Sequence, residues 1–278
     1  MKQSYNIGKV ILVGAGSGDP ELITVKGMRA LQQAEVILTD RLVSPDILKL
    51  YAAPGAKIIY VGKQCRKGNS TPQATINELM LLYAQDGKFV VRLKGGDVSI
   101  FSNILDELET LVHNKIPYEI VPGVTAALGA AAYAGIPLTA RNHSTAVRFL
   151  TAYKSDVVSD EYWKDLAQTD DTLVFYMSSE TLSNVANHLI KYKISKDKQL
   201  AIIEQATTPY QQVFTCSLYD YEEKFANKKF MSPTLVIIGK VVALHEQYQW
   251  FESSSIKEEY FKAANVSWQE QEQLALTA

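Results

Sequence analysis

The chain has 278 residues, of which 47% are hydrophobic and 21% are charged, a composition typical of a globular protein with one or two domains. Its formal net charge of −2 provides no general attraction to nucleic acid or to an anionic membrane. No apolar run approaches the ~20 residues of a membrane span, and residues 1–6 lack the apolar core of a signal peptide. We therefore expect a cytoplasmic protein with neither nucleic acid nor a membrane as a partner.

The cysteine and histidine patterns argue against two common kinds of site. Cys65 and Cys216 stand far apart in the sequence, which fits a reduced cytoplasm better than a disulfide scaffold. The four histidines are scattered without the spacing of metal ligands, so we expect no metal site.

The first 122 residues alternate strand and helix signals. Short β-branched or apolar runs predict strands at residues 9–13, 35–39, 56–61, 90–94 and 118–121. Helical spacing and capping residues predict helices at residues 20–33, from residue 72, and over residues 104–112. Elements in this order predict an α/β domain with a parallel five-stranded sheet.

Residues able to bind a ligand follow several of the predicted strands. Residues 95–97, Gly-Gly-Asp, end the fourth strand, where bare peptide groups let a ligand approach closely. The first strand runs into residues 14–20 and the second ends at Asp40, an outline shared with dinucleotide-binding units. However, the glycine spacing is G-x-G-x-G, and Asp19 places a negative charge where a pyrophosphate would bind. A dinucleotide pyrophosphate is therefore disfavoured at this turn, whereas a ligand without phosphates, or one that carries a positive charge, is not.

The second half of the chain has its own set of elements. Strands are predicted at residues 146–151, 172–177, 199–204, 212–215 and 234–238, and helices at residues 125–134, 179–191 and 220–227. A short connection before residue 212 predicts an antiparallel pair and therefore a mixed sheet. We divide the chain into an N-terminal α/β domain (residues 8–122), a C-terminal α/β domain (residues 123–251) and a tail (residues 252–278) that forms either a docking helix or a frayed end.

A series of short motifs runs in order from residue 8 to residue 251. They are VGAGSGDPELIT at 13–24, DRLVSP at 40–45, YVGK at 60–63, RLKGGD at 92–97, VPGVTA at 121–126, AGIPLT at 134–139, LVFYM at 173–177 and SPTLVIIG at 232–239. Any one of them is weak evidence, whereas the ordered set is specific. With this set the chain resembles the tetrapyrrole (uroporphyrin/corrin) methyltransferase family, and within it the branch that acts on uroporphyrinogen III.

The resemblance implies a reaction and a cofactor. The reaction would transfer methyl groups from S-adenosyl-L-methionine to two pyrrole carbons of uroporphyrinogen III, giving precorrin-2 for siroheme or cobalamin biosynthesis and S-adenosyl-L-homocysteine. The active site would lie in the cleft between the two domains. By the resemblance, the cofactor contacts would be Ser17, Gly95, Gly96, Asp97, Ile100, Thr125, Ala126, Met177 and Ala206. A sulfonium cation without a pyrophosphate also fits the acidic turn at Asp19.

The resemblance also assigns acid–base chemistry to Asp40 and Lys63. The alkylated pyrrole must lose a proton that a carboxylate can accept, while an ammonium can support charge or return a proton. Alternatively, Asp40 pairs with Arg41 or caps the next turn, and Lys63 binds a substrate carboxylate. Strand-end position and positive charge suggest partners for the acetate and propionate arms of the substrate, although a basic run can also be a solvated loop. These candidates are Arg41, Arg66, Lys67 and Arg141.

The chain departs from the family pattern after Asp97. Where the family has GGDPFIFGRGGEE, residues 95–107 read GGDVSIFSNILDE, without the proline, the later glycines and the arginine. Two alternatives follow: a methyltransferase for a later corrin precursor, or an S-adenosylmethionine-binding protein that has lost catalysis. An NAD-dependent oxidoreductase is a third alternative, which the glycine spacing disfavours.

The resemblance further implies protein partners. A homodimer is expected from the family. The first strand begins close to residue 1, which leaves no room for the dehydrogenase–ferrochelatase module of multifunctional siroheme synthases. We therefore expect a separate precorrin-2 dehydrogenase/ferrochelatase to act downstream.

Overall fold

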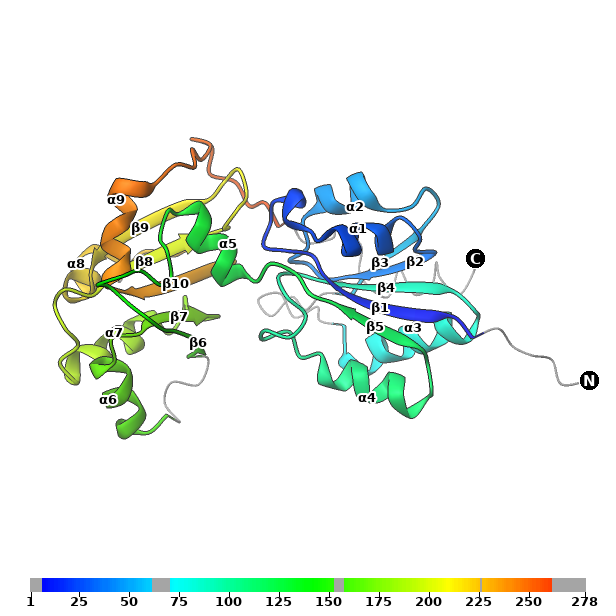
Figure 1. Cartoon of the computed structure of the whole chain (residues 1–278), viewed down its shortest axis with the longest axis horizontal. Helices are drawn as coiled ribbons and strands as arrows, with labels where there is room; N and C mark the ends of the chain where they lie inside the picture. The colour runs from blue at the N-terminus through cyan, green and yellow to red at the C-terminus, as the bar shows by residue number, and fades with distance from the viewer. Residues whose placement is uncertain (1–6, 62–70, 153–157, 226, 262–278) are drawn as a thin grey trace, which may run out of the picture. The chain divides into compact units, whose positions relative to one another are not determined.

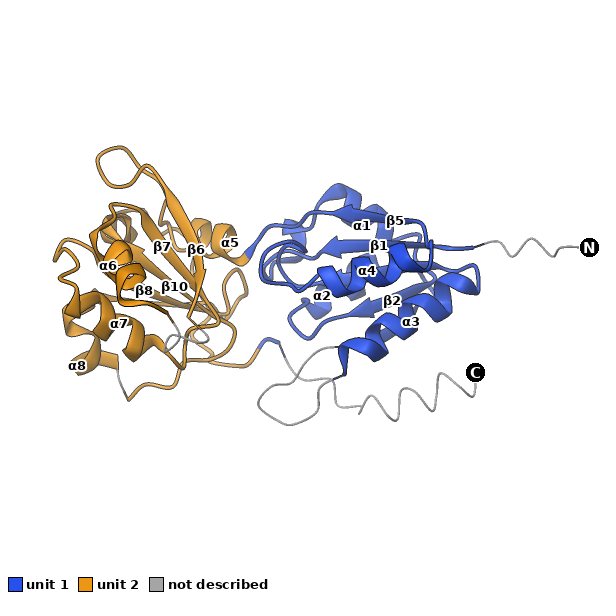
Figure 2. Ribbon diagram, turned by 90° about the horizontal axis from the view of Figure 1, so that it is seen from below, with its two compact units in different colours: residues 1–125, 260–278 blue, residues 126–259 orange. Residues whose placement is uncertain are grey.

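The computed structural model describes residues 7–61, 71–152, 158–225 and 227–261 (Figure 1). The chain divides into two compact units, which Figure 2 distinguishes by colour. Unit 1 contains the chain up to Thr125 and resumes at Tyr260, and unit 2 is Ala126–Glu259. None of the helices in the described part of the chain has the length and hydrophobicity that a membrane crossing needs.

Unit 1 is built on a parallel five-stranded sheet, as predicted. Its strands are β1 (Lys9–Gly14), β2 (Val36–Thr39), β3 (Lys57–Tyr60), β4 (Phe89–Lys94) and β5 (Tyr118–Val121). They lie in the order β3-β2-β4-β1-β5, and each neighbouring pair is parallel. This order places β4 at the centre of the sheet and brings the carboxyl ends of all five strands to one edge.

Helices cover both faces of the unit 1 sheet (Figure 1). The helices are α1 (Val25–Leu31), α2 (Pro45–Tyr51), α3 (Gln73–Gln85) and α4 (Leu105–His113). Alternate strand residues enter two separate cores: Ile11 packs with α1 and α2, whereas Leu12 packs with α3 and α4. Burial on both faces explains why the central strands are continuous apolar runs.

The helix predicted over residues 20–33 is interrupted. A 3-10 turn, η1 (Pro20–Leu22), begins after Asp19, whose carboxylate accepts a hydrogen bond from the backbone N–H of Glu21 at 2.8 Å. The chain is then extended at Ile23, and the hydroxyl of Thr24 accepts from the N–H of Gly27 at 3.1 Å to begin α1. A second N-cap therefore restarts the helix, because a threonine hydroxyl can replace the missing intrahelical acceptor.

Unit 2 contains the predicted mixed sheet. Its strands are β6 (Val147–Thr151), β7 (Thr172–Tyr176), β8 (Gln199–Glu204), β9 (Gln212–Ser217) and β10 (Thr234–Gly239), in the order β6-β7-β10-β8-β9. The pair β6–β7 is parallel and the other pairs, including the predicted pair β8–β9, are antiparallel.

Two sets of helices cover the unit 2 sheet. Helices α6 (Asp160–Gln168) and α7 (Leu182–Lys191) pack on one face, and the alanine-rich α5 (Ala126–Tyr133) packs on the other. Two short helices complete the unit: α8 (Tyr221–Phe225) and α9 (His245–Tyr248). Because the side chains of α5 are small, its backbone can lie close to the sheet.

Candidate active site

Four loops of unit 1 meet at the edge formed by the carboxyl ends of its strands. Gly16 follows β1, Asp40 follows β2, residues 95–97 follow β4, and Gly123 follows β5. Ligands of open parallel α/β sheets bind at this edge, so the predicted strand-end residues share one location.

Glycines allow three of these loops to pack backbone against backbone. Gly16 and Gly96 exchange two hydrogen bonds, at 3.1 and 2.7 Å, and both adopt positive φ angles, of 81° and 70°. A Cβ on Gly14 would lie 2.6 Å from the nitrogen of Gly123, and a Cβ on Gly123 would lie 2.3 Å from the carbonyl oxygen of Gly96. The loop packing by itself therefore requires glycines, in addition to any space that they leave for a ligand.

Asp97 ties the β4 loop to the β5 loop. Its Oδ2 accepts a hydrogen bond from the N–H of Gly123 at 2.9 Å, and its Oδ1 accepts from the N–H and the hydroxyl of Ser99 at 2.8 and 2.5 Å. Partial burial raises the pKa of Asp97, but hydrogen bonds from Ser99, Gly123 and Val98 outweigh it and hold the pKa below its ordinary value. The carboxylate predicted to bind the cofactor therefore also organises the site.

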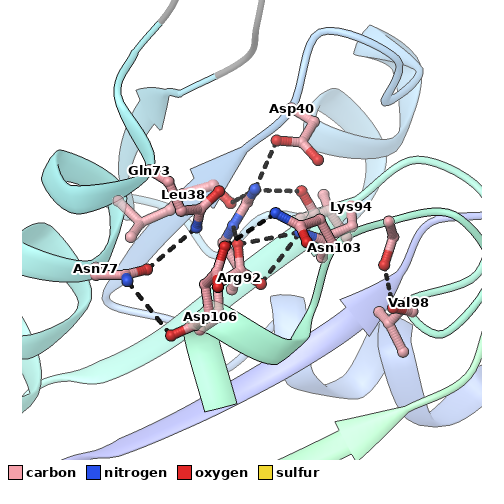
Figure 3. Close-up of polar contacts among 12 residues, drawn as sticks. Leu38, Asp40, Gln73, Asn77, Arg92, Lys94, Val98, Asn103 and Asp106 are labelled. Atoms are coloured by element: carbon pink, nitrogen blue, oxygen red, sulfur yellow. Dashed lines mark hydrogen bonds and ion pairs between the residues drawn. The ribbon is translucent and has the colours of Figure 1, made fainter. Parts of the chain in front are cut away.

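Four charged side chains form a network beneath the loops (Figure 3). Arg92 of β4 donates from Nε to Glu107 Oε1 at 2.9 Å and from Nη2 to Asp40 Oδ1 at 2.7 Å. Lys94, two residues along the same strand, donates from Nζ to both oxygens of Glu107 at 3.0 and 3.1 Å. Arg92, Lys94 and Glu107 are 2%, 4% and 0% exposed, so two buried cations face a buried carboxylate and the partly exposed Asp40.

The two cations of this network respond differently to burial. Burial lowers the pKa of Arg92, but the charges of Asp40 and Glu107 raise it further, so its pKa lies above its ordinary value and the guanidinium stays charged. Burial and the neighbouring charge of Arg92 lower the pKa of Lys94, against the opposing effect of Asp40 and Glu107. Arg92 is thus a fixed cation that can orient Asp40, and Lys94 is a weaker one.

Asp40 has the geometry of a carboxylate held at one oxygen. Its side chain is 27% exposed, and Oδ1 is engaged by Arg92. Among the residues that the structure describes, Oδ2 has no hydrogen-bond partner. The alternative pairing with Arg41 does not occur, because Arg92 takes that place and Arg41 donates to the carbonyl of Phe261 at 3.2 Å. Asp40 can therefore accept a proton on Oδ2 while Arg92 holds the rest of the carboxylate.

The other predicted site residues fall into three groups. Lys63, Arg66 and Lys67 lie outside the described residues. Ser17, Ile100 and Thr125 belong to unit 1, on or near its loop edge. Unit 2 contains Ala126, Arg141, Met177 and Ala206.

Met177 is notable within unit 2. It directly follows β7, its φ is 53°, and it is 56% exposed. A positive φ is uncommon for a residue other than glycine, and such conformations concentrate at functional sites. The backbone at Met177 therefore agrees with its predicted role in cofactor binding without testing it.

The loop that departs from the family pattern is closed by its own contacts. The hydroxyl of Ser102 donates to the carbonyl of Val98, and the side-chain amide of Asn103 donates to Asp106 Oδ2 at 3.0 Å (Figure 3). Phe101 and Asn103 adopt positive φ angles, of 51° and 52°. Two residues of the loop thus adopt left-handed backbone conformations although neither is a glycine.

Sequence reasoning did not assign Glu107 a role, nor Arg92 and Lys94 beyond their motif. Two cations at alternate positions of an otherwise apolar strand were the available signal, because such charges need a buried partner. No group of three His, Cys, Asp or Glu side chains within the described ranges could hold a metal ion.

This parallel sheet, its glycine loops and its arginine-held aspartate accompany a match to a known family. The sequence model of the Tetrapyrrole (Corrin/Porphyrin) Methylases matches residues 9–222, and the chain belongs to this family. Siroheme synthase of Pseudomonas fluorescens (strain SBW25) is 47% identical over 250 residues, which are 90% of this chain and 53% of that protein. The chain thus spans about half the length of the curated relatives it matches.

Two solved structures narrow the comparison. Uroporphyrin-III C-methyltransferase from Thermus thermophilus, complexed with S-adenyl homocysteine, superposes with a TM-score of 0.71 at 32% identity, over 91% of this chain and 99% of that chain. Cobalt precorrin-4 methyltransferase, a cobalamin biosynthetic enzyme, superposes with a TM-score of 0.74 at 30% identity, over 84% of this chain and 95% of that chain. The predicted family and the two-domain α/β fold are therefore confirmed.

Proposed function

We propose that the protein is a methyltransferase that uses S-adenosyl-L-methionine to methylate two pyrrole carbons of uroporphyrinogen III, producing precorrin-2. The observation that carries this proposal is Asp40, held by buried Arg92 at the loop edge of a tetrapyrrole methylase sheet. The match to the Thermus thermophilus uroporphyrin-III C-methyltransferase, over 99% of its length, supports uroporphyrinogen III as the substrate.

The unit 1 residues fit a ligand that carries a sulfonium cation. The carboxylates of Asp40 and Asp97 are partly exposed at the loop edge, and Asp19 lies at the first turn after β1. When bound, S-adenosyl-L-methionine supplies an electrophilic methyl group. The proposed contacts are Ser17, Gly95, Gly96, Asp97, Ile100 and Thr125 from unit 1 and Ala126, Met177 and Ala206 from unit 2.

Asp40 is the proposed base. After a pyrrole carbon gains a methyl group, the alkylated ring must lose a proton from a neighbouring position, and Oδ2 of Asp40 can accept it while Arg92 fixes Oδ1. A positioned base typically contributes about 10²–10⁴ in rate. Lys63 is proposed as the acid that supports charge or returns a proton.

Cations are proposed to bind the carboxylate arms of the substrate. Arg41 adjoins Asp40 in the chain, and Arg141 is exposed on unit 2. Arg66 and Lys67 complete the proposed set. Guanidinium groups suit this role because they can donate two parallel hydrogen bonds to one carboxylate.

A later corrin precursor is a second candidate substrate. The observation in its favour is the TM-score of 0.74 with cobalt precorrin-4 methyltransferase, which is as high as that with the uroporphyrin-III enzyme. The family resemblance also supports a homodimer and a cytoplasmic location as parts of the proposal.

The test is incubation of the protein with uroporphyrinogen III and methyl-labelled S-adenosyl-L-methionine, followed by mass spectrometry of the product. Two methyl groups per tetrapyrrole are expected. No incorporation into uroporphyrinogen III, together with incorporation into a later precursor, would support the second candidate. Binding of S-adenosyl-L-homocysteine without any turnover would support a protein that has lost catalysis.

Asp40→Asn tests the base. We expect turnover to fall by about 10²–10⁴-fold, the contribution of a positioned base, while the Kd for S-adenosyl-L-homocysteine stays unchanged in calorimetric titration. Asp86→Asn is the matched control, because Asp86 is an exposed residue at the end of α3. Turnover of Asp40→Asn equal to that of the control would refute the assignment.

A further inference from the structure

Two residues from the far end of the described chain pack against unit 1. After unit 2 ends at Glu259, Tyr260 and Phe261 return to the first unit, and we call these two residues the strap. Phe261 is 1% exposed, which makes it one of the largest fully buried side chains among the described residues. Large buried aromatic side chains contribute strongly to packing, so the strap is an anchored part of unit 1.

The strap bonds to the segment that follows β2. Ser44 Oγ lies 2.7 Å from the hydroxyl oxygen of Tyr260, and that hydroxyl donates to Asp46 Oδ2 at 2.9 Å. Because a phenol has one hydrogen to donate, Ser44 is the donor in the first of these bonds. Ser44 is 1% exposed, and burial raises the pKa of Tyr260 to about 12, so these bonds are partly shielded from water.

A third contact reaches a proposed substrate-binding residue. The Nη1 of Arg41 donates to the carbonyl oxygen of Phe261 at 3.2 Å. A guanidinium has five N–H donors in a planar fork, so a bond to this carbonyl is compatible with a bond to a substrate carboxylate. The contact fixes where the guanidinium lies before any substrate arrives.

Residues 40–46 run from the end of β2 into the first turn of α2; we call them the β2 loop, and they are thus held at both ends. Arg92 holds Asp40 at the start, and Tyr260 holds Ser44 and Asp46 at the end. Arg41 lies between these two anchors. We propose that the strap positions the β2 loop for the substrate, with Tyr260 as a positioning residue for Arg41 and Asp40.

This inference rests on the proposed function for its substrate. One alternative predicts a change in KM of the opposite sign. If the carbonyl of Phe261 competed with a substrate carboxylate for Arg41, the strap would inhibit binding. Loosening a positioning strap raises the KM for the tetrapyrrole, whereas loosening a competing strap lowers it. The direction of the change in KM therefore separates positioning from competition.

Tyr260→Phe in the full chain removes the hydroxyl and keeps the ring. Without substrate, we expect faster hydrogen exchange at the amides of Val43 and Ile47, which donate to the carbonyls of Asp40 and Ser44 within the β2 loop. With uroporphyrinogen III, we expect KM to rise by about 3- to 10-fold, the factor that one hydrogen bond supplies. The Kd for S-adenosyl-L-homocysteine should be unchanged. Tyr162→Phe, at an exposed tyrosine of α6, is the matched control.

Three outcomes would overturn the proposal. Unchanged exchange at Val43 and Ile47 would show that the strap does not hold the loop. Faster exchange with an unchanged KM would show that substrate binding does not depend on how firmly the strap holds the β2 loop. A lowered KM would establish competition. If the wild-type protein does not methylate uroporphyrinogen III, the proposed function fails, and the exchange measurement still decides whether the strap orders the loop.

Ser44→Ala provides a second variant. Ser44 and Tyr260 share one hydrogen bond, so the double variant should change KM and amide exchange little more than Tyr260→Phe alone. Fully additive effects would show that the two residues act independently and would contradict a shared anchor.

Discussion

Replacing Glu107 by glutamine is the most direct perturbation of the buried charge network. Glu107 is 0% exposed and accepts hydrogen bonds from Arg92 at 2.9 Å and from Lys94 at 3.0 and 3.1 Å. Glutamine preserves the shape of the side chain and removes its charge. Asp40, which contacts only Arg92 within the network, would then have to balance two buried cations.

The expected cost of Glu107→Gln is large. Removing one member of a buried ion pair typically lowers the free energy of unfolding by about 3–5 kcal/mol, because the remaining charge stays buried without compensation. Chemical denaturation followed by a unit 1 probe would measure this loss. Glu109→Gln is the matched control on the same helix, where the exposed side chain should change stability by less than about 0.5 kcal/mol.

The pH dependence provides a sharper test of the same reasoning. Burial and Arg92 already lower the pKa of Lys94, and without Glu107 the opposing attraction is weaker, so the pKa should fall further. The folded state then binds fewer protons than the unfolded state between this pKa and the ordinary value of 10.5, and the free energy of unfolding rises with pH in that window. The deficit of Glu107→Gln should therefore shrink as the pH rises toward 10.

Adding Lys94→Met to Glu107→Gln should recover part of the lost stability, about 1–3 kcal/mol, because it removes the cation that lost its partner. A loss below about 1 kcal/mol for Glu107→Gln alone, or a double variant less stable than the single one, would refute the account of the network.

Three further predictions concern other features. Gly14→Ala places a Cβ 2.8 Å from the carbonyl oxygen of Gly96 and should lower both Tm and S-adenosyl-L-homocysteine affinity, whereas Gly239→Ala, also at a strand end but 3.3 Å from its nearest neighbour, should lower Tm much less and leave the affinity unchanged. Burial raises the pKa of Cys216 to about 11, so in protein whose other cysteine is serine, alkylation at pH 8 should require unfolding; modification of folded protein would contradict this. Hydrogen bonds from two lysines lower the pKa of Glu119 to about 2, so its stabilising effect should be complete above pH 4.5 and disappear as the pH falls toward 2; a carbon-13 NMR midpoint near 4.5 would contradict this.

The strands of both sheets could be predicted from the sequence because burial leaves a clear pattern. In unit 1, all four residues from Val10 to Val13 are buried, two on each face, so the strand reads as an unbroken apolar run. In unit 2, the short connection before β9 identified the antiparallel pair with β8. These signals are local, and they survive without knowledge of the neighbouring elements.

Helix boundaries depended on short helices and on capping residues, which the hydrophobic periodicity of the sequence does not show. Helix α2 was not predicted. It has only seven residues, and two helical turns are too short to show a clear repeat of apolar residues. Helix α6 was also missed, although Ser159 accepts a hydrogen bond from the N–H of Tyr162 as an N-cap. The break at Thr24 followed from a second cap inside an apparently continuous helix signal.

The network around Asp40 could not be predicted because its partners are brought together by packing. Glu107 is 13–15 residues from Lys94 and Arg92 in sequence and occupies the first turn of α4, where acidic residues are usually solvated. Glu107 is completely buried because α4 packs on the face of the sheet from which Arg92 and Lys94 of β4 reach it. Asp40 itself was assigned through family resemblance, and the structure adds the arginine that holds it.

Substrate choice must lie in side chains that the common fold does not determine. The uroporphyrin-III and cobalt precorrin-4 enzymes match this chain with TM-scores of 0.71 and 0.74, so the backbone alone does not separate the two reactions. In this chain the position of a family arginine is occupied by Asn103, whose amide is bonded to Asp106. The loop therefore offers no guanidinium to a substrate carboxylate at that position. Among the cations of unit 1 that the structure describes, we propose Arg41, which donates to the carbonyl of Phe261 in the strap, as a residue that takes over this recognition.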